Sequence, residues 1–194
     1  MNAPWEALAA AVRACVSCSE LAASRTLVVV GEAPPGARLA LVGEAPGAQE
    51  DAAGRPFVGR AGALLDTLLA EVGVQRADVA VLNVLKCRPP SNRVPRPAEV
   101  ANCRPWLEQQ LDLVAPRVTV ALGLSATRWF LGRTTTLGAV RGRLHEVSGR
   151  QVVPTYHPSA ALRFGPEGAP LAALRGDLGY AVTLLGPSDP LAAG

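Results

Sequence analysis

The chain is organised around one long loop, Leu41-Val-Gly-Glu-Ala-Pro-Gly-Ala-Gln-Glu-Asp-Ala-Ala-Gly-Arg-Pro-Phe-Val-Gly59. It starts in an apolar run, residues 39–42, that predicts a buried strand, and it leads into an apolar-periodic segment, residues 61–72, that predicts a helix. The loop therefore lies at the carboxyl end of a strand, which is where ligands bind in open α/β sheets. We expect a binding site here.

The composition of this loop is that of a binding site. Glu44, Glu50 and Asp51 place three carboxylates close together in the sequence. Phe57 lies among prolines and glycines rather than in an apolar stripe, which favours stacking on a ligand over packing in the core. Four glycines allow the backbone to approach a ligand closely: Gly43, Gly47, Gly54 and Gly59.

The bulk composition is that of a globular protein. Of the 194 residues, 49% are hydrophobic and 18% are charged, which excludes a disordered chain. No apolar run approaches the roughly 20 residues that span a membrane, and the N-terminal residues lack the basic-then-apolar order of a secretory signal. We therefore expect a cytoplasmic protein with no membrane association. The net charge of +3 permits nucleic-acid binding without indicating it.

Further strands and helices alternate along the chain. Apolar runs predict three more strands: residues 79–84, 118–122 and 151–155. Periodic segments predict four more helices: residues 5–14, 98–114, 124–131 and 169–185. The alternation indicates an α/β fold with one domain over residues 1–194 and a four-stranded parallel sheet sandwiched between helices. The ordered core should cover residues 5–185, and the tail after Gly186 should fray.

A second phrase resembles the start of the loop. Val28-Val-Val-Gly-Glu-Ala-Pro-Pro-Gly36 precedes Leu41-Val-Gly-Glu-Ala-Pro-Gly47, so the sequence contains Gly-Glu-Ala-Pro twice. The first copy runs through a Pro-Pro-Gly turn into the next apolar run, which predicts a β-hairpin. Only the second copy leads into the loop and helix, so we interpret Glu32 as structural and Glu44 as a site residue.

The four cysteines of the chain indicate one shared site. Cys15 and Cys18 form a CxxC pair, and Cys87 and Cys103 add two further thiols. The pattern suits a [4Fe–4S] cluster or a structural zinc with four sulfur ligands, and disulfides or buried free thiols are the alternatives. Disulfides are disfavoured without a secretory signal. The spacing alone does not separate iron–sulfur from zinc.

Three ordered motifs and the cysteines together resemble a known family. The motifs are Gly43-Glu-Ala-Pro-Gly47 with the loop after it, Asn83 with Lys86-Cys-Arg-Pro-Pro90, and His157-Pro-Ser159. This set, over about residues 5–185, closely resembles the family 4 uracil-DNA glycosylases, the iron–sulfur branch of their superfamily. The resemblance implies a structural [4Fe–4S] cluster on all four cysteines: Cys15, Cys18, Cys87 and Cys103.

The resemblance also implies a reaction on uracil-containing DNA. Such an enzyme flips the uridine out of the helix, hydrolyses its N-glycosidic bond and leaves an abasic site without cutting the strand. A related branch traps the sugar through a His in an inserted loop. No such His follows Lys86-Cys-Arg88 here, which favours hydrolytic release. We expect a monomer that acts on nucleoid DNA.

Three residues are predicted to be catalytic. Asn83 can accept a hydrogen bond from uracil N3–H and donate one to O4 through a single amide. His157 can donate to uracil O2 as negative charge develops on the leaving base. Glu44 is the candidate for positioning the attacking water beside a sugar with oxocarbenium character.

Further residues are predicted to contact the base or the DNA. Phe57 should stack on the flipped uracil, and Glu50 should crowd uracil C5 and so exclude the methyl group of thymine. The full base-binding set is Gly43, Ala45, Glu50, Asp51, Phe57, Asn83 and His157. The candidates for phosphate contacts are Arg88, Arg93 and Arg163. Leu162 is a candidate wedge for the space that the flipped base leaves, with ordinary helix packing as the alternative.

Two other classes of protein stay open at this point. The first is a nucleic-acid binding protein that is stabilised by the cluster or by zinc and has no catalytic activity. The second is a nucleotide-binding α/β protein. The chain contains neither G-x-x-x-x-G-K-S/T nor G-x-G-x-x-G, the phosphate-binding patterns of that class, which argues against it.

Overall fold

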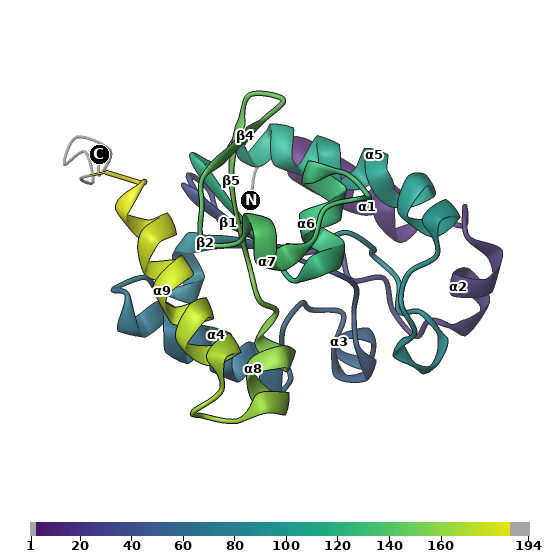
Figure 1. The fold of residues 1–194 in the computed structure, drawn as a ribbon. Helices are drawn as coiled ribbons and strands as arrows, with labels where there is room; N and C mark the ends of the chain where they lie inside the picture. Colours follow the sequence, from purple (N-terminus) through teal and green to yellow (C-terminus); the bar gives the residue numbers. More distant parts are fainter. Residues whose placement is uncertain (1–2, 187–194) are drawn as a thin grey trace.

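The computed structural model describes residues 3–186 and shows an α/β fold with one sheet between two layers of helices (Figure 1). The residues after Gly186, whose fraying is predicted above, lie outside the described residues. Over the described range, no helix is both long and apolar enough to cross a lipid bilayer.

The sheet contains five strands: β1 Leu39–Gly43, β2 Val79–Asn83, β3 Val118–Leu122, β4 His145–Val147 and β5 Arg150–Thr155. Their spatial order is β2-β1-β3-β5-β4. The four predicted strands are β1, β2, β3 and β5, which run parallel. The predicted sheet is one strand short, because β4 pairs with β5 in the antiparallel direction. With three residues and none of them buried, β4 leaves too little pattern in the sequence.

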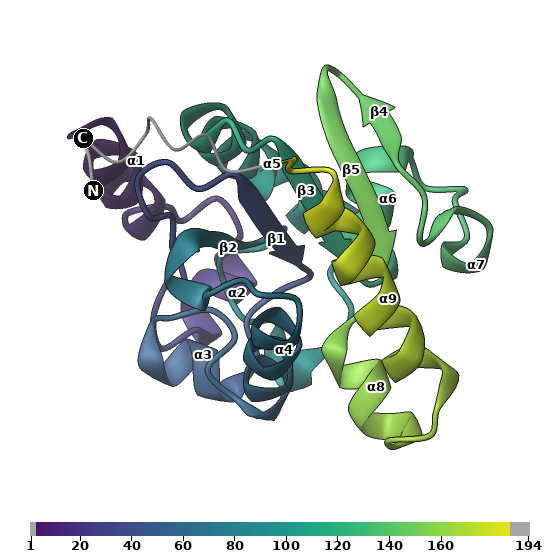
Figure 2. The same cartoon turned by 90° about the vertical axis from the view of Figure 1, so that its left-hand side faces the viewer.

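Helices cover both faces of the sheet. One layer contains α1 (Ala3–Arg13), α5 (Pro97–Val114) and α6 (Leu124–Leu131), and the other contains α4 (Arg60–Glu71) and α9 (Ala169–Thr183). In Figure 2, α4 and α9 lie in front of the sheet and α5 and α6 lie behind it. The shorter helices of the described chain are α2 Ser19–Ser24, α3 Ala48–Ala53, α7 Leu137–Val140, α8 Pro158–Phe164 and the 3-10 helices η1 Arg76–Asp78 and η2 Pro90–Asn92.

Alternate residues of each strand pack against opposite layers, because successive side chains of a strand point to opposite faces. In β1, Ala40 and Val42 join the apolar cluster that includes α1, α5 and α6. Leu39 and Leu41 join the cluster that includes α4 and α9. Both faces are buried, which explains why the strands read as continuous apolar runs in the sequence.

The predicted hairpin before β1 is wrong. Both edges of β1 are occupied by β2 and β3, so the preceding residues cannot pair with it. They follow the outer edge of β2 instead, where Glu32 exchanges backbone hydrogen bonds of 2.9 and 2.7 Å with Val81. Glu32 therefore belongs to the edge of the sheet and not to a loop at the strand ends.

The parallel strands end level with one another. Gly43 of β1 pairs with Asn83 of β2, and Leu122 of β3 pairs with Thr155 of β5. The segments that follow these residues leave the same edge of the sheet, which is the edge where open α/β proteins bind ligands.

Candidate active site

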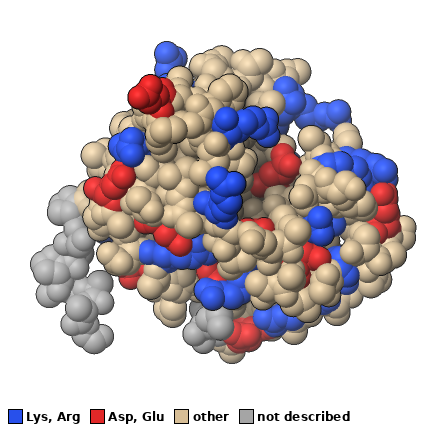
Figure 3. Space-filling view, turned by 90° about the horizontal axis from the view of Figure 1, so that it is seen from below, with Lys and Arg blue, Asp and Glu red and all other residues tan. Residues whose placement is uncertain are grey.

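A pocket of about 260 Å³ lies at the carboxyl edge of the parallel strands. Its walls include the pocket loop, which we define as residues 41–59, the end of β2 and the start of α8. Figure 3 views the molecule from this end and shows acidic surface in a hollow with basic surface around it. Six of the residues that were predicted to bind the base or act on it line the pocket: Glu44, Ala45, Glu50, Phe57, Asn83 and His157.

Asn83 ends β2 with its side chain in the pocket wall. The residue is 3% exposed. Within residues 3–186 no group forms a hydrogen bond with its side-chain amide. A polar group in so enclosed a place is costly to leave without a partner, so the amide is ready for a ligand that supplies one donor and one acceptor.

Gly43 leaves the space that Asn83 and Phe57 need. A Cβ atom at position 43 would lie 2.5 Å from the carboxamide oxygen of Asn83 and 2.7 Å from the Phe57 ring. Any side chain here would displace one of the two groups. Gly43 therefore shapes the pocket through its close approach and not through a contact of its own.

His157 follows β5 and caps the start of α8. Its Nδ1 accepts a hydrogen bond from the backbone N–H of Ser159 at 3.1 Å and lies 2.9 Å from the Ser159 hydroxyl. Burial lowers the pKa of His157 to about 4, and the nearby Glu50 only partly opposes this effect. A neutral imidazole that accepts at Nδ1 carries its proton on Nε2, so His157 has a fixed N–H donor.

Phe57 lines the pocket with a ring that is otherwise packed in the core. The ring stacks on His157 with centroids 5.5 Å apart, is 6% exposed and joins the apolar cluster of α4 and α9. Its backbone φ is +50°, which bulky residues rarely adopt. Such a conformation costs on the order of 1–3 kcal/mol and persists only where neighbouring groups hold it.

Glu44 follows β1 and accepts a short hydrogen bond from the hydroxyl of Ser125 on α6. Two neighbouring parallel strands, β1 and β3, thus contribute one residue each to this pair. The sequence analysis missed Ser125. A signal was present, because Gly123-Leu-Ser125 directly follows an apolar strand, as Gly43-Glu44 does.

Glu50 and Asp51 are neighbours in α3, but only Glu50 reaches the pocket. The Glu50 carboxylate accepts from the backbone N–H groups of Gly47 at 3.1 Å and Gly59 at 3.3 Å, which ties two parts of the pocket loop together. Asp51 is 2% exposed and accepts from the backbone N–H of Thr26 at 3.0 Å. Asp51 does not line the pocket, because consecutive helical residues face in different directions, and nothing in the structure supports the prediction that it binds the substrate.

The four cysteines line a second, small cavity of about 20 Å³. Cys15 and Cys18 come from the segment between α1 and α2, Cys87 from the loop after β2, and Cys103 from α5. Among the described residues, no three His, Cys, Asp or Glu side chains are close enough to bind one metal ion. A zinc ion needs four ligands at about 2.0–2.3 Å, whereas a cluster places its cysteines on separate irons. Four thiols are the ligand set of both groups, so the donor chemistry of this cavity suits a [4Fe–4S] cluster or a structural zinc.

Hydrogen-bond donors point at these sulfurs. Arg25 donates from Nη1 to the Sγ of Cys87 at 3.1 Å, and Asn102 donates from Nδ2 to the Sγ of Cys18 at 3.6 Å. Burial raises the pKa of Cys103 to about 11, and the Lys86 ammonium group opposes this rise. A cationic and an amide donor beside four sulfurs suit a group that is held by thiolates.

A buried connector, residues 84–86, joins the pocket to the cysteine cavity. The backbone N–H of Val84 donates to Gly43 at 2.9 Å and that of Leu85 to Glu44 at 3.0 Å. The Nζ atom of Lys86 donates to the backbone carbonyl of Asn83 at 2.7 Å. All three side chains are 1% exposed, so the connector has fixed contacts along its length.

Known proteins resemble this chain over most of its length. The profile of the uracil DNA glycosylase superfamily matches residues 29–175. The type-4 uracil-DNA glycosylase of Thermotoga maritima is 47% identical over 154 residues, which cover 78% of this chain and 80% of that protein. This chain belongs to the type-4 uracil-DNA glycosylase family.

Two archaeal members of the type-4 family give the same result. The type-4 enzyme of Pyrobaculum aerophilum is 44% identical over 145 residues, which cover 71% of this chain and 68% of that protein. That of Archaeoglobus fulgidus is 42% identical over 144 residues, with 70% and 66% covered. The family that the motifs predicted is therefore confirmed.

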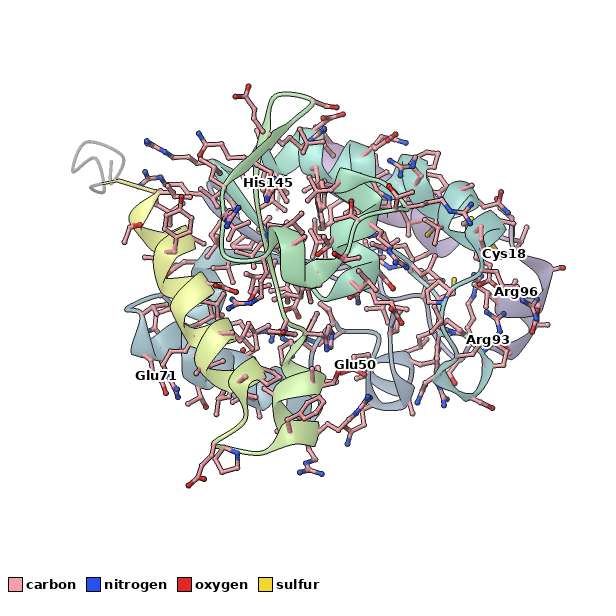
Figure 4. The ribbon with its side chains drawn as sticks, viewed as in Figure 1. Cys18, Glu50, Glu71, Arg93, Arg96 and His145 are labelled. Carbon is pink, nitrogen blue, oxygen red and sulfur yellow. The ribbon has the colours of Figure 1, made fainter. Side chains whose placement is uncertain are left out.

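Arg93 of this type-4 family member is already paired inside the protein. Its guanidinium binds the Glu99 carboxylate at 2.6 and 2.9 Å and lies 3.4 Å from Glu20. Figure 4 shows Arg93 beside the cysteine end of the molecule, near Arg96. Arg93 also lines the pocket, and two carboxylates compensate its charge, so its phosphate contact stays a prediction.

The other residues that were predicted to contact DNA are exposed or have an uncharged partner. The Nε atom of Arg88 donates to the amide oxygen of Asn92 at 2.8 Å, which leaves its charge uncompensated by that partner. Arg163 and Leu162 are exposed on α8, the helix that begins at the pocket. Leu162 is 37% exposed, so this side chain is available for contact outside the protein.

Proposed function

We propose that this protein excises uracil from DNA. It binds a flipped uridine, hydrolyses the N-glycosidic bond and leaves an abasic site in an intact strand. The observation that carries the proposal is one pocket that combines the free amide of Asn83, the neutral imidazole of His157 and the ring of Phe57. The relatives named type-4 uracil-DNA glycosylases support the same reaction.

The amide of Asn83 selects the base. Its oxygen accepts from uracil N3–H while its nitrogen donates to O4. Cytosine presents an unprotonated N3 and an amino group at these positions, so both hydrogen bonds would be lost. A site that is built around such bonds rejects a mismatched ligand by about 10⁴-fold or more. Glu50, fixed by Gly47 and Gly59, crowds C5 and excludes the methyl group of thymine.

His157 stabilises the leaving base. As the glycosidic bond breaks, negative charge develops on uracil and the Nε2–H of His157 donates to O2. The imidazole does not need to be protonated for this role. Its orientation is supported by the hydrogen bond that Nδ1 accepts from Ser159. Phe57 stacks on the face of the flipped base and keeps it in place.

Glu44 acts on the sugar side of the reaction. The sugar gains oxocarbenium character, which a carboxylate stabilises, and a water molecule must then attack it. The hydroxyl of Ser125 donates to the Glu44 carboxylate and fixes its direction. We assign Glu44 to orienting the water and Ser125 to orienting Glu44.

We propose that the four cysteines hold a [4Fe–4S] cluster, with a structural zinc as the alternative. When bound, the group would cross-link the N-terminal segment, the loop after β2 and α5, and its binding energy would stabilise the fold. Arg25 and Asn102 donate to its sulfur ligands and offset their negative charge. The four-thiol ligand set and the two donors beside it support this proposal.

The partner of the pocket is uracil-containing DNA. Arg88 and Arg163 would contact phosphates, and Leu162 would occupy the space left by the flipped base. We propose that the protein works as a monomer, because residues of one chain make up the pocket walls described here. Because its substrate is DNA, we propose that the protein acts in the cytoplasm, at the nucleoid.

Excision from a defined oligonucleotide tests the proposal. Anaerobically purified protein is incubated with DNA that holds one deoxyuridine, treated with alkali and analysed for strand cleavage. Wild type should cleave only at uracil, and Asn83→Ala should be slower by about 100-fold or more while its affinity for undamaged DNA is kept. The visible absorption spectrum and the metal content of the same sample test the cofactor. No excision by folded, cluster-loaded protein would favour a binding protein without catalysis.

A further inference from the structure

Arg76 connects several groups near the pocket that the proposed chemistry does not use. It begins η1, just before β2, and is partly buried. Its Nη2 donates to the backbone carbonyl of Pro56 at 2.7 Å, and its Nη1 donates to that of Phe57 at 3.1 Å. The same guanidinium forms ion pairs with Glu32 at 3.1 Å and with Asp66 at 3.0 Å. One side chain therefore contacts the pocket loop, α4 and the edge of the sheet.

Glu32 gives Arg76 a fixed point on β2. The backbone of Glu32 exchanges two hydrogen bonds with Val81, which lies two residues before Asn83 in the same strand. The carboxylate of Glu32 then holds the guanidinium of Arg76. Through this path the strand that places Asn83 is connected to the carbonyls on either side of the Phe57 backbone.

Phe57 needs such support because its backbone is strained. Its φ of +50° is a conformation that other contacts must maintain. On one side, α4 packs so closely that a Cβ at Gly62 would lie 1.8 Å from the Phe57 carbonyl oxygen. On the other side, Arg76 supplies the donors for that carbonyl and for the carbonyl of Pro56.

We propose that Arg76 is a positioning residue for base capture: it holds the Phe57 ring at a fixed place relative to the Asn83 amide. The inference rests on the proposed excision of uracil. It also assigns a purpose to the first Gly-Glu-Ala-Pro copy of the sequence, because Glu32 anchors Arg76 while Glu44 works in the pocket. Arg76 does not line the pocket and acts only through Phe57.

Arg55 provides a matched control for this proposal. Its Nε also pairs with Glu32, at 2.6 Å, and among the described residues its side chain donates to no carbonyl of the pocket loop. Arg55→Met therefore removes an ion pair with the same carboxylate while the two carbonyls keep their donor. Arg76→Met removes the ion pairs and the carbonyl contacts together, and Arg76→Lys keeps a charge but not the two-pronged geometry.

A double-mutant cycle on the single-turnover rate constant tests the action through Phe57. We expect Arg76→Met to slow excision by about tenfold, since slight misplacement of a group in an active site is costly, with Arg76→Lys in between. Arg55→Met should stay within about twofold of wild type. In a Phe57→Ala background, Arg76→Met should have no further effect. An equal slowing in both backgrounds would overturn the proposal.

Hydrogen–deuterium exchange over residues 55–62 gives a readout that does not depend on activity. Exchange in this segment should rise in Arg76→Met and Arg76→Lys and stay at the wild-type level in Arg55→Met. Unchanged exchange in both Arg76 variants would refute the holding role. If the wild type excised no uracil, the proposed function would fail, and the exchange data would still decide whether Arg76 holds the loop.

Discussion

The pocket and the cysteine cavity lie close together but differ in how their polar groups are hydrogen-bonded. Asn83 and Cys87 are separated by three residues, but the Asn83 amide has no partner among the described residues, whereas the Cys87 sulfur already accepts from Arg25. The pocket leaves polar groups without partners, so that they can bind a substrate that later dissociates. The cavity surrounds its sulfurs with donors, as a permanent occupant requires. Substitutions in the pocket should therefore reduce activity, and substitutions in the cavity should reduce stability.

The largest effect on the pocket side should come from His157→Ala. Loss of the donor to the leaving base should lower the single-turnover rate constant by about 100–1000-fold. The melting temperature should fall by only about 2–4 °C, which corresponds to one lost helix cap. His145→Ala is the matched control, because His145 bonds to the Val140 carbonyl outside the pocket. A similar loss of activity in both variants would contradict the assignment.

On the cavity side, Cys103→Ala should act through stability. Removal of one cluster ligand should abolish the visible absorbance and lower the melting temperature by roughly 10 °C, the shift expected for a few kcal/mol in a chain of this size. Excision measured well below the new melting temperature should persist in part. If activity vanished in a variant that stayed fully folded, the two regions would not be separable in this way.

The pH dependence distinguishes the pocket histidine from an ordinary one. Because burial lowers the pKa of His157 to about 4, the rate constant should stay within about twofold between pH 7.5 and 5.5. An imidazole with the usual pKa of about 6.5 would lose roughly tenfold over that range. Protonation would add a hydrogen at Nδ1, which must accept from Ser159. An NMR titration of the imidazole with a midpoint near 6.5 would contradict this prediction.

The same pKa shift has a consequence for stability. The unfolded chain takes up a proton at His157 near pH 6.5, whereas the folded chain resists it until about pH 4. The contribution of this residue to stability is therefore complete above pH 6.5 and decreases as the pH falls toward 4. Chemical denaturation of wild type and His157→Ala at pH 7.5 and 5 measures the difference.

The smallest effects should come from arginines that the proposed chemistry does not use. Arg163→Gln should weaken DNA binding by about two- to threefold and reduce the salt dependence of log K by about one unit, as expected for one lost phosphate contact. Arg93→Gln should leave that slope unchanged and lower the melting temperature, because it removes the ion pair with the largely buried Glu99 carboxylate. The reverse pattern would place Arg93 on the DNA.

The sequence was informative where a polar residue lies at the end of an apolar strand or just after it, although Ser125 was missed in such a place. Asn83, Glu44 and His157 were found in this way, and parallel strands that end level bring such residues together. Local patterns were less informative for side-chain direction. Asp51 shares α3 with Glu50 but turns to Thr26, and Arg93 turns to Glu99. Both outcomes depend on tertiary partners that lie elsewhere in the chain.

Two other features depended on pairing that a sequence does not display. The residues around Glu32 had the pattern of a hairpin, but the edges of β1 were taken by other strands, so they paired with β2. The strand β4 is held by β5 and has no buried residue of its own. Short edge elements of this kind derive their conformation from the neighbour and not from their own composition.

In the buried connector between the two regions, the number of residues should matter more than which residues they are. Backbone hydrogen bonds to Gly43 and Glu44 fix the start of residues 84–86. Cys87 is the next residue and must reach the cysteine cavity. One inserted or deleted residue would move the three buried side chains away from their contacts and would put either Asn83 or Cys87 out of reach of its site. Substitutions here can be compensated by repacking. Insertions and deletions cannot, so the segment should resist the length variation that loops beside active sites usually tolerate.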